Sequence, residues 1–275
     1  MSRISYDQVK DRFAGVIRRS TIIRRLFYLM LDLLFLRSWY IRRLLRIYGD
    51  KRDHKAWTLL DAGCGFGQYD RFILDRFKSV LVTAVDVKDS YLKDCRSFFS
   101  GTGRGERVRF ERVDLLTFDH KESFDMILCV DVLEHIEEDR KVLENLRGSL
   151  KPGGVILIHS PSHLSEEDAD EGESSFVDEH ARSGYSRSEL SEKLLTAGLK
   201  PLETNYTYGR WGHLSWVWVV KWPMMLLNKA GMAGGLLLLP YYLVILPIGL
   251  LLNRIDMIGV NRKGTGIYAV GRRPE

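Results

Sequence analysis

The chain has 275 residues, of which 45% are hydrophobic and 28% are charged. This length allows one large domain, or one domain with a substantial insertion, and it is sufficient to bury a sizeable core. The composition excludes a disordered chain and a protein made mostly of membrane-spanning helices. We therefore expect a folded body that mostly faces water.

The positive charge is concentrated at the start of the chain. The overall net charge is +5, but residues 1–55 contain 14 Lys and Arg against five acids, whereas the remainder carries a net −4. This regional excess predicts that the N-terminal segment meets an anionic surface. It argues against a protein whose whole surface binds nucleic acid, so we expect no nucleic-acid partner.

The three cysteines, Cys64, Cys95 and Cys129, are an odd number without C-x-x-C spacing. This pattern argues against a disulfide framework, and no His, Cys and Asp cluster has the spacing of a metal site. The first apolar stretch begins only near Ile22 and is interrupted by charges, so no signal peptide is recognised. We expect the core of the protein to lie in the reducing cytoplasm.

Residues 22–47 mix large apolar side chains with seven charges. The longest nearly apolar run, residues 26–36, is shorter than the roughly 20 residues that a membrane span needs. Basic residues at both ends of this run, with Trp39 and Tyr40 beside Arg37, favour a helix that lies in the membrane interface. The alternative is an ordinary amphipathic helix that covers a domain or a dimer face.

Residues 57–160 alternate short apolar runs with charged helical segments, which is the pattern of β-α-β units. The expected strands are residues 57–63, 80–87, 108–115, 124–132 and 154–160, followed later by 201–208 and 264–271. The expected helices are residues 68–77, 90–99, 137–150 and 186–197. We predict an α/β fold with a doubly wound, mostly parallel seven-stranded sheet, in which ligands bind at the carboxyl ends of the strands.

Between the last two expected strands, residues 230–252 form a run of 23 uncharged residues. The run has the length of a membrane span, but Pro240 and Pro247 favour a broken or re-entrant helix. If the flanking strands join one cytoplasmic sheet, the insertion crosses the membrane an even number of times or not at all. We expect residues 214–228 and 230–252 to form a membrane-embedded hairpin or an interfacial pair. A buried helical subdomain or an oligomer interface is the alternative.

These patterns divide the chain into four parts. They are a basic amphipathic helical region (1–55), an α/β core (56–208), an apolar membrane-associating insertion (209–263) and the final strand of the core (264–275). The acidic stretch at residues 166–179 is expected to be a solvated loop.

The most specific local signal is DAGCGFG, residues 61–67, where the first strand turns into a helix. Alternating glycines let the backbone turn sharply and approach a ligand closely. Asp86 ends the next strand, 19 residues beyond Gly67, where it is placed to accept both hydroxyls of a ribose. Gln68 replaces the glycine of a dinucleotide fingerprint, and Asp61 would repel a pyrophosphate, so we expect a cofactor with a cationic amine.

This combination resembles the class I S-adenosylmethionine-dependent methyltransferases, of the methyltransferase type 11-like group. The later segments agree in order, including residues 130–135 after the fourth strand and the turn at residues 150–154 before the fifth. The resemblance covers about residues 57–160 well and 186–208 with 264–271 loosely. It does not cover the N-terminal helix or the apolar insertion, where the identity of the substrate must lie.

The resemblance implies that S-adenosyl-L-methionine is the cofactor and that methyl transfer is the reaction. It implies that the glycine-rich loop holds the amino-acid end of the cofactor and that Asp86 holds the ribose. The positions implied to bind the cofactor are Asp61, Gly63, Cys64, Gly65, Gly67, Asp86, Val87, Asp114, Leu115 and Val130.

Methyl transfer requires the protein to hold the nucleophile in line with the sulfonium methyl and to exclude water. His135, at the mouth of the fourth strand, is the candidate general base for a hydroxyl nucleophile, and a role in packing and loop structure is the alternative. His180, Arg182 and Tyr185 resemble the segment that closes over the site, so they contact the substrate or belong to a solvated loop. Nothing in the sequence distinguishes His159 from a surface residue.

The sequence predicts a methyltransferase that works at the cytoplasmic membrane surface on a membrane lipid or a lipid-linked acceptor, which the insertion presents to the site. One alternative is a cofactor-binding membrane scaffold that has lost catalysis. Another is an RNA methyltransferase recruited by the basic N-terminus, although its arginines alternate with apolar side chains and no RNA-binding module is recognised. The acceptor atom and the oligomeric state stay open.

Overall fold

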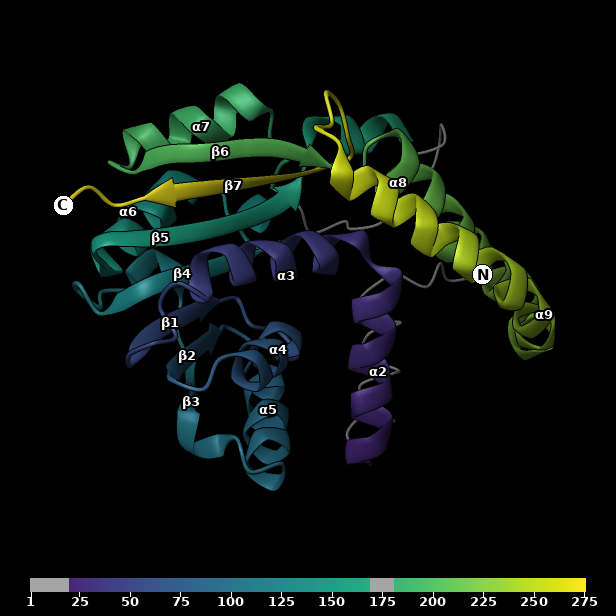
Figure 1. Cartoon of the computed structure of the whole chain (residues 1–275), viewed down its shortest axis with the longest axis horizontal. Coiled ribbons are helices and arrows are strands. Elements are labelled where there is room, and N and C mark those ends of the chain that lie inside the picture. Colours follow the sequence, from purple (N-terminus) through teal and green to yellow (C-terminus); the bar gives the residue numbers. More distant parts are fainter. Residues whose placement is uncertain (1–19, 169–180) are drawn as a thin grey trace.

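The structure is a computed structural model that describes residues 20–168 and 181–275. Its centre is a seven-stranded sheet with helices on both faces (Figure 1). Five strands are parallel: β1 (Trp57–Ala62), β2 (Val80–Asp86), β3 (Val108–Arg112), β4 (Phe124–Val130) and β5 (Leu150–Pro161).

The remaining strands are β6 (Lys200–Thr207) and β7 (Gly266–Arg272), and the strand order is β3-β2-β1-β4-β5-β7-β6. Because β7 pairs antiparallel with both β5 and β6, the sheet is mostly parallel with one reversed strand. The predicted doubly wound, seven-stranded fold is therefore confirmed. The order reverses between β1 and β4, where open α/β sheets bind their ligands.

The helices of the core divide between the two faces of the sheet. They are α4 (Gln68–Arg76), α5 (Asp89–Gly101), α6 (Asp139–Ser149) and α7 (Arg187–Thr196). Apolar residues of α4 and α5 pack into one hydrophobic core, and those of α6 and α7 pack into a second core on the other face. The start of α7 is fixed locally, because Ser186 and Glu189 form a capping box.

The N-terminal region forms two helices, not the single interfacial helix expected from residues 22–47. They are α2 (Thr21–Leu34) and α3 (Leu36–Gly49), separated at Phe35, whose backbone is extended. Helix α3 buries Leu36, Ile41 and Leu45 against the first core, so this half follows the alternative of a domain-covering amphipathic helix. Helix α2 projects beyond the sheet at the side where β5 ends (Figure 1).

The insertion leaves the core at the carboxyl edge of the parallel strands. Pro161, at the end of β5, and Thr207, at the end of β6, both pair with Gly266 at the start of β7. The end of β6 and the beginning of β7 therefore lie beside the carboxyl end of β5. The insertion between them starts and finishes at the edge of the sheet where open α/β folds bind their ligands.

The insertion comprises α8 (Arg210–Trp216), a π-helical turn (Val217–Lys221) and α9 (Trp222–Ile258). A straight helix would place Tyr242 about 30 Å from Trp222. The hydroxyl of Tyr242 instead donates to the carbonyl oxygen of Val219 at 2.8 Å. The chain therefore reverses within α9, and residues 210–258 form what we call the apolar hairpin.

The returning arm of the apolar hairpin, residues 238–258, exposes many of its apolar side chains. One described helix, at Leu238–Ile258, is long and apolar enough to cross a membrane, by length and composition alone, and 17% of its most apolar window is buried within the molecule. The side chains of Leu239 and Leu243 are 73% and 74% exposed. This exposure disfavours the alternative of a subdomain packed inside the core.

Asp256 joins the base of the apolar hairpin to the core. Its buried carboxylate accepts hydrogen bonds from the Tyr40 hydroxyl of α3 at 2.9 Å, the Gly212 backbone amide at 2.9 Å and the Asn261 side-chain amide at 3.0 Å. Hydrogen bonds to an ionised acceptor are stronger than neutral ones. The three donors come from α3, α8 and the segment before β7, so this carboxylate fixes the orientation of the hairpin.

Candidate active site

The glycine-rich loop connects β1 to α4 at the carboxyl edge of the sheet. Gly63, Gly65 and Gly67 have φ values of 86°, 51° and 73°, in the left-handed region that favours glycine. A Cβ at Gly63 would lie 2.2 Å from Cγ2 of Val132, so the backbone there is too closely packed for a side chain. At Gly65 no atom of the described residues, apart from those of Gly65 and its two chain neighbours, lies within 4 Å of the Cβ position. This leaves space beside the backbone.

Asp86, at the end of β2, holds this loop in place. Its Oδ2 accepts from the backbone N–H of Gly65 at 2.9 Å, and its Oδ1 accepts from that of Lys88 at 2.8 Å. Each carboxylate oxygen has a second lone pair, so these bonds leave acceptor capacity for a diol. Val87, the predicted adenine neighbour, is exposed next to it.

The other predicted cofactor positions follow along the same edge. Asp114 is exposed after β3 and accepts from the Leu116 backbone N–H at 2.9 Å, which caps the short 3-10 turn Leu115–Thr117. Leu115 is buried there, and Val130 is the last residue of β4. The structure thus places the predicted positions at the ends of β1 to β4, and their contacts with a cofactor stay a prediction.

Two buried acids lie at the loop, Asp61 on β1 and Asp70 on α4. Their carboxyl groups interact with each other, and apart from that contact Asp61 Oδ2 and both Asp70 oxygens have no hydrogen-bond partner among the described residues. Burial, followed by the charge of Asp70, raises the pKa of Asp61 well above its usual range. Buried acceptors without donors are costly, so this pair fits the cationic amine of an amino-acid ligand.

Helix α2 closes over the back of the glycine-rich loop. Arg24 Nη2 donates to the carbonyl oxygen of Phe66 at 2.9 Å, and the hydroxyl of Tyr28 donates to the same oxygen. Arg24 Nη1 also donates to the carbonyl oxygen of Asp94 on α5 at 2.7 Å. The Phe66 ring lies 4.4 Å from that of Tyr91. Sequence reasoning missed these contacts.

Asp32 continues the polar side of α2. Its buried carboxylate binds Arg71 at 2.6 Å and accepts from Gln68 Nε2 at 2.9 Å, and Arg42 lies 3.4 Å away. The Gln68 side chain therefore anchors the start of α4 to α2. The four-residue spacing of Arg24, Tyr28 and Asp32 is the signal that reveals this buried polar stripe.

A chain of Arg, Asp and His side chains lies near the carboxyl ends of β4 and β5. Asp131 follows β4 with a φ of 52° and forms an ion pair with Arg37. Asp131 Oδ1 lies 2.9 Å from His159 Nδ1, and His159 Nε2 lies 3.1 Å from Thr207 Oγ1. His159 is buried, a position that the sequence did not distinguish from a surface one. Burial, with Arg37 nearby, holds its pKa well below the usual value and keeps the ring neutral.

His135 ends a short 3-10 turn, Leu133–His135, and its side chain is exposed. Its neighbour Glu134 points inward, where Oε2 accepts from the Ser160 hydroxyl at 2.8 Å. Burial raises the pKa of Glu134 to about 7. The role of His135 as a general base stays a prediction.

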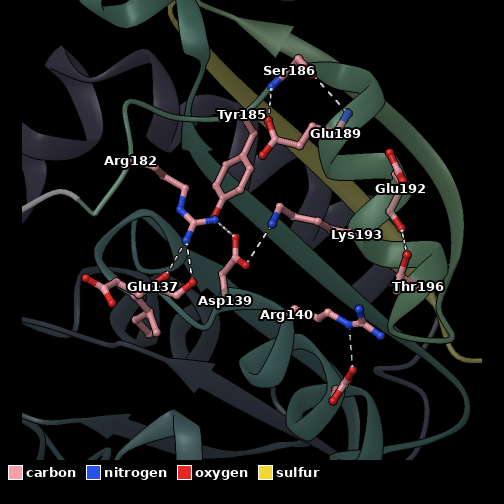
Figure 2. A network of polar contacts seen from close by, with 12 residues as sticks. Glu137, Asp139, Arg140, Arg182, Tyr185, Ser186, Glu189, Glu192, Lys193 and Thr196 are labelled. Carbon is pink, nitrogen blue, oxygen red and sulfur yellow. Dashed lines mark hydrogen bonds and ion pairs between the residues drawn. The ribbon is translucent and has the colours of Figure 1, made fainter.

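Asp139 gathers two of the three predicted substrate residues into a packed cluster (Figure 2). The fully buried Tyr185 donates to Asp139 Oδ2 at 2.6 Å, and Lys193 lies 3.0 Å from Oδ1. Arg182 forms an ion pair with Asp139 and donates to the carbonyl oxygen of Ile136 at 2.9 Å. A buried carboxylate needs such donors, and the cluster ties α6 to α7. The burial of Tyr185 excludes a solvated position for its side chain, and substrate contact by Arg182 and Tyr185 stays a prediction.

Other predictions fall outside the described residues, namely His180 and most of the acidic stretch, residues 169–179. Within residues 20–168 and 181–275, no group of His, Cys, Asp and Glu has the arrangement of a metal site. Cys64, Cys95 and Cys129 are all buried and free.

A doubly wound sheet, a glycine-rich loop after β1 and an acid that ends β2 together define the core as a class I S-adenosylmethionine-dependent methyltransferase fold. Residues 60–156 match the sequence model of a family described as a methyltransferase domain. The resemblance predicted from the sequence is confirmed for this core.

Curated proteins resemble the chain over little more than a third of its length. A ubiquinone biosynthesis O-methyltransferase from Idiomarina loihiensis is 31% identical over 100 residues, 36% of this chain and 40% of that protein. A trans-aconitate 2-methyltransferase from Rhizobium rhizogenes is 29% identical over 107 residues, 39% of this chain and 40% of that protein. The chain thus spans less than half the length of these curated relatives.

A solved structure supports the fold over a longer range. Phosphoethanolamine N-methyltransferase 2 from Haemonchus contortus, in complex with S-adenosyl-L-methionine, superposes with a TM-score of 0.59 at 17% identity. The match covers 86% of this chain and 53% of that chain. At this identity the likeness concerns the fold alone.

The first prediction concerns Asp86. We expect Asp86→Ala to weaken S-adenosylmethionine binding about a hundredfold, because the side chain holds the Gly65 amide and is placed to bind the ribose diol. Isothermal titration calorimetry measures the change, and Glu111→Ala on the next strand is the control. Unchanged affinity in Asp86→Ala would remove the ribose assignment.

The second prediction concerns pH and Glu134. Its folded-state pKa of about 7 exceeds that of an unfolded glutamate, so its stabilisation is full below about pH 4 and is lost as the pH rises through 7. We expect Glu134→Gln to reduce the fall in unfolding free energy between pH 5 and pH 8 by roughly 2 kcal/mol. Urea titrations in mild detergent measure it, with the partly exposed Glu144→Gln as control. An equal fall in unfolding free energy between pH 5 and pH 8 in the two variants would contradict the role of Glu134 in this pH dependence.

Proposed function

We propose that this chain is an S-adenosylmethionine-dependent methyltransferase that acts at the cytoplasmic membrane surface on a lipidic or lipid-linked acceptor. The observation that carries the proposal is the placement of two features at one edge of the sheet. The glycine-rich loop follows β1 there, and the apolar hairpin leaves the core there between Thr207 and Gly266. A lipid held by the hairpin would therefore be close to the cofactor.

The residues at the loop fit the cofactor. Asp61 and Asp70 supply buried acceptors that have no partner among the described residues except each other. Gly65 leaves space beside the backbone, and Asp86 offers lone pairs to the ribose. When bound, S-adenosylmethionine supplies an electrophilic methyl group on a sulfonium. The remaining task of the chain is to orient the acceptor in line with that methyl and to exclude water.

The need for a base depends on the acceptor atom. An amine that is already neutral needs no proton acceptor before it attacks, whereas a hydroxyl benefits from one. His135, after β4 at the carboxyl edge, is the residue we propose for that role. His159 is kept neutral but is enclosed between Asp131 and Thr207, so we assign it to positioning Asp131.

Positive charge at the base of the apolar hairpin supports the proposal that the core lies on the cytoplasmic side of the membrane. Arg210, Arg254, Arg262 and Lys263 flank the hairpin on the side of the core, and all four are exposed. Basic residues next to an apolar segment favour the cytoplasmic face and its anionic lipids. The matched relatives are named for ubiquinone in one case and trans-aconitate in the other, so the acceptor is proposed from the hairpin alone.

A turnover measurement distinguishes the proposed methyltransferase from a scaffold that binds the cofactor without catalysis. Incubation of the full chain with a membrane lipid extract and methyl-labelled S-adenosylmethionine should transfer label to a lipid, which mass spectrometry detects as a gain of one methyl group. Cofactor binding without transfer to any lipid would favour the scaffold. Transfer to RNA in place of lipid would revive the RNA methyltransferase.

The third prediction tests His135. If the acceptor is a hydroxyl, we expect His135→Ala to lower turnover about a hundredfold, the usual contribution of a positioned base, while cofactor affinity changes little. The measurement compares kcat with the cofactor Kd in the same preparation. Equal turnover in the variant and the parent would give His135 a structural role.

The fourth prediction tests the hairpin. Each exposed Leu contributes about −0.5 kcal/mol to insertion into lipid, so replacing Leu239, Leu243 and Leu251 with Gln should move the protein from the membrane fraction to the soluble fraction. High salt alone should not release the parent. Leu81→Gln and Leu195→Gln, at exposed apolar sites of the core, are the controls. Recovery of the parent as a lipid-free, soluble monomer without detergent would overturn membrane association.

A further inference from the structure

Helix α2 is amphipathic in the reverse of the usual sense. Its buried side consists of Arg24, Tyr28 and Asp32, four residues apart. Its outer side consists of large apolar side chains, of which Ile22 is 69% and Leu26 is 59% exposed. Surface helices of soluble proteins place the apolar stripe inward and the charges outward. The reversal indicates that something apolar covers the outer side of α2.

The outer side of α2 is formed by five exposed residues. They are Ile22, Ile23, Leu26, Leu29 and Met30. Arg25 is exposed among them, and residues 1–19, which directly precede the helix, contain five Lys and Arg against two acids. An apolar face bordered by cationic charge complements an anionic lipid surface, because such helices bury the apolar side between headgroups and hold anionic lipids with the basic residues.

The polar side of α2 acts on the cofactor loop. Arg24 and Tyr28 both donate to the carbonyl oxygen of Phe66, which follows Gly65 in the glycine-rich loop. Asp32 holds Gln68 and Arg71 at the start of α4, directly after the loop. A single helix thus has its outer side available to lipid and its inner side bonded to the segment expected to bind the cofactor.

We propose that α2 docks its outer side on an anionic bilayer and that this docking strengthens cofactor binding through the Phe66 carbonyl. The inference rests on the proposed function, since it assumes that the loop binds S-adenosylmethionine. An isolated helix of 14 residues is marginal in water, so contacts on either side of α2 favour its formation. Lipid contact on one side therefore favours the loop contacts on the other, and by linkage the cofactor favours docking.

The test uses the full chain in nanodiscs of phosphatidylcholine alone or with phosphatidylglycerol. We expect S-adenosylmethionine to bind about fivefold or more tightly in the anionic discs, the lower end of typical coupling between sites. The double variant Leu26→Gln with Leu29→Gln should lose this difference, because its outer side no longer docks. Leu195→Gln, an equally exposed leucine on α7, should retain it.

Two further measurements separate the docking of α2 on the bilayer from the effect of that docking on cofactor affinity. Amide hydrogen exchange of residues 21–34 should slow in the anionic discs for the parent and not for the Leu26 and Leu29 double variant. Tyr28→Phe removes one donor to Phe66 and keeps the outer side, so it should still show slowed exchange but a smaller gain in cofactor affinity. Equal cofactor affinity in the two lipids for the parent would overturn the inference.

The outcomes also distinguish this inference from the proposed function. If the chain does not bind S-adenosylmethionine in either lipid, the proposed function fails. If it binds equally in both and still methylates lipid, only the coupling through α2 fails. If the parent dimerises and the double variant is monomeric with no lipid effect, the outer side of α2 is an interface between two copies of the chain, which also overturns the inference.

Discussion

The antiparallel pairing of β7 between β5 and β6 is the constraint on which the functional arrangement depends. Because Gly266 pairs with both Pro161 and Thr207, the insertion between β6 and β7 must begin and end at the carboxyl edge of the sheet. The glycine-rich loop and Asp86 lie at that edge for a different reason, the parallel order of β1 and β2. The glycine-rich loop and the apolar hairpin thus lie at the same edge of the sheet, although the two segments are far apart in the sequence.

Local patterns predicted the core well, because its determinants are short in range. Alternation of apolar runs and helical segments located the strands, and the glycine spacing of residues 61–67 located the loop, since left-handed backbone is a property of those residues themselves. The buried polar groups were missed or misjudged. His159 depends on Asp131 and Thr207, and Tyr185 depends on Asp139, which are contacts between distant parts of the chain.

Contacts between distant segments also explain why the N-terminal region forms two helices that bury different kinds of side chain. Its mixture of arginines and aliphatic residues predicted an interfacial helix, and the pattern does not reveal which side of each helix meets the core. Helix α3 buries its apolar side, whereas α2 buries Arg24 and Asp32, because backbone carbonyls and Arg71 are there to receive them. A buried charge is tolerated only with such partners, and they belong to segments more than 35 residues away.

Side-chain hydroxyls of the apolar hairpin donate to backbone carbonyls of its opposite arm. In hydrocarbon, every backbone carbonyl must find a donor within the protein, and a π-helical turn or a proline removes regular helical bonds. Here the hydroxyl of Ser215 donates to the carbonyl of Gly249 at 3.0 Å, and those of Tyr241 and Tyr242 donate to the carbonyls of Trp218 and Val219 at 2.6 and 2.8 Å. If the hairpin were in water, water molecules could donate to these carbonyls. That side chains of one arm supply donors to the other is compatible with the membrane-associated hairpin that we propose.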